Sequence, residues 1–89
     1  MNIEIFNLIT FDSTHSAIRA EKELLSMDIK VKVIPVPTEI TASCGLSIKI
    51  NLDDLCKARK ILLKEKIQVS GYYHIKKTGL IKEIRAIHE

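Results

Sequence analysis

Short stretches of strand-like hydrophobic pattern occur four times along the chain. Residues 3–11 are rich in Ile and Phe, which is typical of a buried strand. Residues 29–36 and 45–50 alternate apolar and polar side chains, as expected of half-exposed strands, and residues 67–75 form a fourth candidate with Gly71 inside it as a bulge. Lysines in residues 29–36 suit the edge of a sheet.

Two stretches of helical spacing separate these strands. The first covers residues 14–27 after the capping candidates Asp12, Ser13 and Thr14, and the second follows Asn51 as its cap. The predicted core positions of the two helices are Ala17, Ala20, Leu24 and Met27, and then Leu55, Ala58 and Leu62.

The two halves of the chain repeat one another at a spacing of 38 residues, which is the distance from Leu24 to Leu62. At that spacing Ile29 corresponds to Ile67, Val31 to Val69, and Ser13 to Asn51. Two such strand–helix–strand halves predict an α+β fold, a ferredoxin-like βαββαβ sandwich with an antiparallel sheet in the order 4-1-3-2 and both helices on one face.

The last residues lie beyond that unit. We therefore expect a ferredoxin-like domain over residues 1–76 and a C-terminal helical extension over residues 77–89. Thr78 is a candidate cap for this helix, in which Leu80, Ile84 and Ile87 share one face. Such a face packs on its own domain or on a second copy in a homodimer, and a frayed tail is the alternative.

Composition and charge narrow the class of protein. Eighty-nine residues make one domain. The chain has no apolar run of the ~20 residues that a membrane span needs and no signal-peptide pattern, so we expect a cytoplasmic protein without membrane contact. Two cysteines argue against a disulfide framework. The net charge of +3 is mild, and without a basic block or a stacking platform nucleic-acid binding is disfavoured.

The residues between the second and third predicted strands do not follow the apolar pattern of a packed helix or strand. Pro35 and Pro37 interrupt regular pairing, and Cys44 and Gly45 follow after small and hydroxyl residues. A loop this long more often has a function than a purely structural role. Cys44 is its strongest nucleophile, and two interpretations stay open: a reactive thiol or a small buried hydrophobic residue.

The predicted topology favours the reactive thiol. The first strand ends where the third begins, so Cys44 is expected near the amino end of the first helix, where the helix dipole favours a thiolate. His15 is a candidate to hold or exchange the thiol proton, unless it is only an exposed polar residue. The candidate binding residues around this position are Ser13, Thr14, Ser43 and Gly45.

Two further thiol questions follow from the sequence. Cys44 and His15 lack the additional ligands that a structural zinc needs, so no metal site is predicted. Cys56, inside the second predicted helix, is expected to be a small buried residue of low reactivity.

Three segments resemble a known family: residues 8–21 (LITFDSTHSAIRAE), 33–40 (VIPVPTEI) and 43–47 (SCGLS). They are similar to the selenium/sulfur carrier-like family of small bacterial and archaeal domains, over roughly residues 5–75. The resemblance implies a cysteine that holds sulfur or selenium as a persulfide or perselenide, without a cofactor. It also implies donor and acceptor proteins as partners. Asp12 stands where a proline is common in the family, and the residues after Lys76 are extra.

Two functions from different classes follow. The first is a carrier of sulfur or selenium on Cys44, closer to a sulfurtransferase than to a classical enzyme. The second is a non-catalytic, ACT-like module that binds a small ligand or another protein, with Cys44 in a structural role. The reactivity of the Cys44 thiol separates the two, since only the carrier needs an accessible thiolate.

Overall fold

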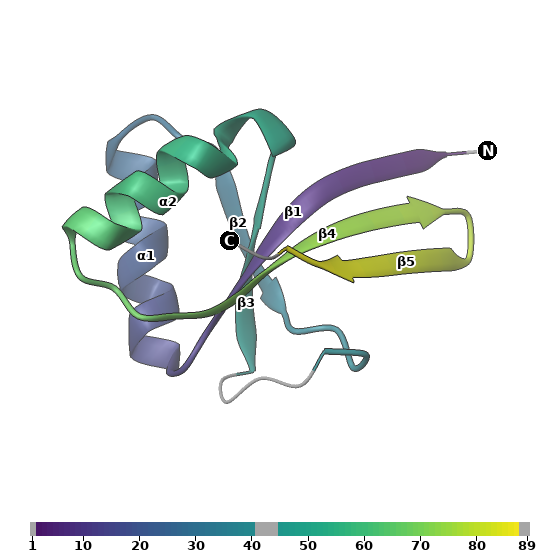
Figure 1. Ribbon diagram of the computed structural model, residues 1–89, viewed down its shortest axis with the longest axis horizontal. Helices are drawn as coiled ribbons and strands as arrows, with labels where there is room; N and C mark the ends of the chain where they lie inside the picture. Colours follow the sequence, from purple (N-terminus) through teal and green to yellow (C-terminus); the bar gives the residue numbers. More distant parts are fainter. Residues whose placement is uncertain (1, 41–44, 88–89) are drawn as a thin grey trace.

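The computed structural model describes residues 2–40 and 45–87, which form one antiparallel sheet with two α-helices on one of its faces (Figure 1). The strands are ordered β2-β3-β1-β4-β5 across the sheet. In chain order the elements are β1 (Ile3–Phe11), α1 (Thr14–Ser26), β2 (Val31–Pro35), β3 (Leu46–Ile50), the 3₁₀ turn η1 (Leu52–Asp54), α2 (Leu55–Lys64), β4 (Val69–Thr78) and β5 (Ile81–Ala86).

The predicted ferredoxin-like fold is wrong, because the sheet does not consist of four strands in the order 4-1-3-2 followed by a helix. Residues 81–86, assigned to that helix, form β5 and pair with β4. Gly79 adopts a positive φ of 59° in a tight turn that brings Thr78 opposite Ile81, and glycine enters such turns at little cost. Pairing supplies the tail with partners for its backbone, whereas an isolated helix of this length is marginal in water.

Both helices end in the same left-handed motif, and this motif explains the part of the sequence repeat that runs from Leu24 to Ile29 and from Leu62 to Ile67. The residues with positive φ are Asp28 at 61° and Lys66 at 57°, which are again 38 residues apart. The next amide in each case donates to the carbonyl five residues earlier, Ile29 to Leu24 and Ile67 to Leu62, both at 3.0 Å. This is the pattern of a Schellman motif, in which the two bonded residues also pack together, and all four are buried.

The main core lies between the helices and one face of the sheet, which we call the helix face. It consists of Ile9 and Phe11 from β1, Ile48 and Ile50 from β3, Ala17, Ala20 and Leu24 from α1, Leu55, Ala58 and Leu62 from α2, and Ile29 and Ile67 just after the two helices. Met27, predicted to belong to this core, is instead 62% exposed, since α1 ends at Ser26.

A smaller core covers the opposite face of the sheet, which we call the loop face. Its buried members are Phe6 and Leu8 of β1, Ile75 of β4, and Ile40 from the segment after β2. The central strand β1 is therefore buried on both faces from Phe6 to Phe11, which is why its sequence shows an apolar run with no clear alternation.

Candidate functional site

The carboxyl end of β1 and the amino end of β3 lie side by side, with Thr10 directly opposite Ser47. Both hydroxyl side chains are buried and satisfied by backbone carbonyls of neighbouring strands. Thr10 Oγ1 donates to the Gly71 carbonyl at 3.3 Å, beside the bulge predicted at that glycine, and Ser47 Oγ donates to the Ile34 carbonyl at 3.1 Å. Four strands are thus tied together at this end of the sheet.

The helix α1 begins directly after β1 at the same end. Ser13 is its N-cap, and the Ser13 hydroxyl accepts a hydrogen bond from the Ser16 amide at 3.1 Å. The first turn carries no acidic side chain, so the positive end of the helix dipole is not neutralised from within the helix. Asp12, just before the cap, is exposed to solvent.

Gly45 marks the entry into β3. Its carbonyl accepts a hydrogen bond from the Val36 amide at 3.0 Å, which continues the β2–β3 pairing by one step. Gly45 is exposed, and a β-carbon added to it would meet no atom of residues 2–40 and 46–87 within 4 Å. None of these described residues therefore fills the space beside Gly45.

The predicted site residues fall into two groups. Ser13, Thr14 and His15 form the start of α1, His15 is exposed there, and Gly45 lies at the start of β3 at the same end of the sheet. Ser43 and Cys44 lie outside the described residues. The adjacency of the first and third strands, from which the site was predicted, is confirmed by four residue pairs between β1 and β3.

The residues that follow β2 pack across the loop face of the sheet, and we call residues 36–40 the proline segment. The Ile40 amide donates to the Pro37 carbonyl at 3.0 Å, which closes a tight turn. The Ile40 side chain is 8% exposed and packs with Phe6, Leu8 and Ile75. Sequence reasoning missed this contact, although an isoleucine within a stretch of small polar residues was the available signal.

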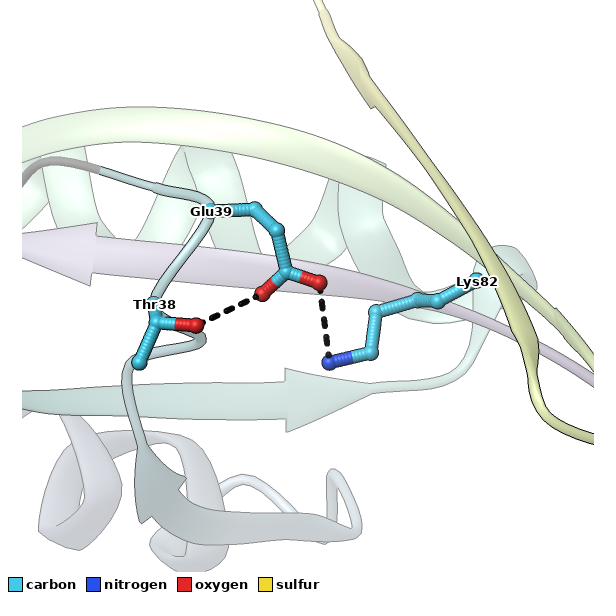
Figure 2. Close-up of polar contacts among 3 residues, drawn as sticks. All are labelled: Thr38, Glu39 and Lys82. Carbon is cyan, nitrogen blue, oxygen red and sulfur yellow. Dashed lines mark hydrogen bonds and ion pairs between the residues drawn. The ribbon is translucent and has the colours of Figure 1, made fainter.

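Glu39 extends from the proline segment to the far strand β5 (Figure 2). One carboxylate oxygen lies 3.6 Å from Lys82 Nζ, and the other accepts a hydrogen bond from the Thr38 hydroxyl at 3.2 Å. Bonding to its own backbone amide, aided by Lys82, lowers the pKa of Glu39 below its ordinary value. The proline segment is thus held at one point by burial of Ile40 and at another by an ion pair.

A groove of about 400 Å³ runs along this contact between the proline segment and the loop face. It combines apolar walls with Lys77 and with the Glu39–Lys82 ion pair, and its apolar lining includes Phe6, Ile34, Pro37 and Ile75. Such a combination suits an amphipathic ligand.

Cys56 is exposed on α2, and the prediction that it is buried is wrong. The buried positions of this helix are Leu55, Ala58 and Leu62, so the next residue after Leu55 points about 100° away from the core. Leu63, two turns further along α2, is itself 78% exposed. Any assay of thiol chemistry in this protein must therefore distinguish two cysteines.

Residues 2–40 and 45–87 contain neither a candidate metal site nor a helix that could span a membrane. Within these ranges no three His, Cys, Asp or Glu side chains come together as a metal site would require. Neither helix in these ranges is long and apolar enough to cross a membrane.

The chain is similar to a known family of proteins. No curated protein and no solved structure matches the chain. Residues 6–74 match the family described as "Putative Se/S carrier protein-like", and this range contains both ends of the site, from the start of α1 to the entry into β3. Since the match covers well over half of the 89 residues, the chain belongs to the Se/S carrier protein-like family.

Proposed function

We propose that this protein carries sulfur or selenium as a persulfide or perselenide on Cys44. The observation that supports the proposal is the placement of Gly45, the residue after Cys44, at the end of the sheet where β1 passes into α1. Family membership supports the same chemistry.

The start of α1 offers a favourable environment for a sulfur anion. A helix amino terminus favours a nearby negative charge by about 0.3–1 kcal/mol. Since the first turn contains no acidic residue, this effect is available to a group that approaches the Ser13 cap. His15, exposed on the same turn, is the proposed group that holds or returns the thiol proton.

The proposed transfer proceeds in two balanced steps. The Cys44 thiolate attacks the terminal sulfur of a persulfide on a donor protein, so that a new S–S bond forms, the donor S–S bond breaks, and the donor leaves as a thiolate. An acceptor nucleophile then attacks the terminal sulfur on Cys44, and Cys44 leaves as a thiolate. Neither step needs an outside oxidant or cofactor. With selenium, the bond to Cys44 is S–Se instead.

The experiment is intact-mass analysis after incubation with a cysteine desulfurase and cysteine. The expected product is the protein with one added sulfur, about 32 Da heavier, and reducible by dithiothreitol. Cys44→Ser should lose the adduct while Cys56→Ser keeps it. His15→Ala should slow loading and shift its pH midpoint upward. An adduct that survives in Cys44→Ser and disappears in Cys56→Ser would refute the assignment.

The groove beneath the proline segment supports a second candidate, an interaction module with a structural Cys44. Its apolar walls, together with Lys77 and the Glu39–Lys82 pair, are suited to a small amphipathic ligand or a segment of another protein. Site-resolved alkylation with iodoacetamide separates the two functions. Faster reaction at Cys44 than at exposed Cys56 favours the carrier, and slower reaction favours the module.

A further inference from the structure

The strand β5 is an edge of the sheet with one side unpaired by any other described strand. The Ile87 amide donates to the Tyr72 carbonyl at 2.8 Å, so residue 87 directs its backbone groups towards β4. Because these directions alternate along an antiparallel strand, the backbone groups of Lys82, Ile84 and Ala86 point outward. They form a row of donors and acceptors that another strand can pair with.

The opposite edge of the sheet is less suited to pairing. Strand β2 ends in Pro35, which has no backbone N–H and so removes a donor from this edge. The two edges thus differ in their capacity to recruit a strand.

The side chains of β5 are complementary to a second copy of β5 in one antiparallel register. When Ile84 lies opposite Ile84 of a second copy, Glu83 lies opposite Arg85 and Arg85 opposite Glu83. The same register places Ile81, which is 67% exposed, opposite Ile87. Opposite charges therefore meet at Glu83 and Arg85, isoleucines meet at positions 81, 84 and 87, and Lys82 lies opposite Ala86.

The neighbouring registers lack this match. Centring the pair on Glu83 places two glutamates face to face, and centring it on Arg85 does the same with two arginines. Like charges directly opposite one another are destabilising. In the register centred on Ile84, Glu83 and Arg85 also occupy the sites without backbone hydrogen bonds, where opposing side chains approach most closely.

We propose that the protein forms a symmetric dimer in which two copies of β5 pair antiparallel about Ile84. The two five-stranded sheets join into one continuous sheet, held by about six backbone hydrogen bonds from Lys82, Ile84 and Ala86 of both copies. The two-fold axis passes through the Ile84 pair. Figure 1 shows the two helices of one chain at the opposite end of the molecule from the turn between β4 and β5, and a two-fold axis through the Ile84 pair places both helix layers on the same face of the joined sheet. The dimer does not depend on Cys44 or on the carrier function.

The test is sedimentation velocity of the full chain between about 5 and 200 µM, a range suited to a small interface. The wild type should change from monomer to dimer across this range. Glu83→Arg and Arg85→Glu each turn two attractive pairs into repulsive ones and should weaken association about tenfold or more. The double variant with both changes should dimerise again. An equimolar mixture of the two single variants should form a heterodimer, because one copy then presents arginine at both positions and the other presents glutamate at both.

Glu23→Arg on α1 is the matched control and should dimerise like the wild type. Lys76 lies opposite Glu83 within the chain, so Glu83→Arg also brings two cations together in the monomer. For this reason a second measurement uses the wild type alone. Hydrogen exchange at the Lys82, Ile84 and Ala86 amides should slow as protein concentration rises. A monomer at 200 µM, a mixture that does not associate, or exchange independent of concentration would overturn the proposal.

Discussion

Replacing Ile40 by alanine tests whether the proline segment is part of the folded structure. Ile40 is 8% exposed and packs with Phe6, Leu8 and Ile75. The substitution removes three carbons, and at about 0.8 kcal/mol for each buried CH₂ it should cost about 2 kcal/mol. This value lies at the low end for an isoleucine-to-alanine change, because the small cluster at the loop face can partly close around the gap.

A loss of this size is readily measured by thermal or urea unfolding. For a domain of this length each kcal/mol lowers the Tm by about 4–8 °C, so we expect a decrease of about 8–16 °C. Ile18→Ala is the matched control, since Ile18 is 51% exposed on α1 and alanine is the better helix former. It should change stability by less than about 0.5 kcal/mol. If Ile40→Ala is no more destabilising than Ile18→Ala, the proline segment does not contribute to the core as described.

Two further predictions concern the helix ends and pH. Lys66 has a φ of 57°, which costs a side chain about 1–2 kcal/mol, while glycine adds about 0.4–1 kcal/mol of entropy to the unfolded chain. Lys66→Gly should therefore raise the free energy of unfolding by about 0.5–1 kcal/mol. Asp28→Gly should raise it by less, since Asp tolerates this conformation better than Lys. Urea unfolding that shows the same gain for both variants, or a loss for Lys66→Gly, would contradict this reasoning. The pKa of Glu39 is lower in the folded protein than its ordinary value of 4.5. The Glu39 carboxylate therefore stabilises the protein at pH values above 4.5, and this stabilisation is lost as the pH falls through the lowered pKa of the folded state. The Tm difference between wild type and Glu39→Gln should accordingly shrink below pH 4.5 and stay constant from pH 6 to 8.

Much of the candidate site was predictable because it depends on chain direction and capping. Ser13 was one of three adjacent capping candidates, and its hydroxyl accepts a hydrogen bond from the Ser16 amide. The meeting of β1 with β3 followed from the order of strands and helices. The contact from Glu39 to Lys82 was not predictable, because it joins residues 43 positions apart through a strand that the tail was not expected to form.

The sequence by itself determined the two helices and, to within a few residues, the strands β1 to β4, because the local spacing of apolar residues differs between helices and strands. Tertiary structure decided whether residues 81–86 form a helix or a strand. The spacing of Leu80, Ile84 and Ile87 fits a helix, but the open edge of β4 and the turn at Gly79 favour a strand. It also decided which face each apolar side chain covers. Ile40 is buried while Leu63 and Met27 are exposed, because burial depends on what lies opposite in the fold and not on hydrophobicity alone.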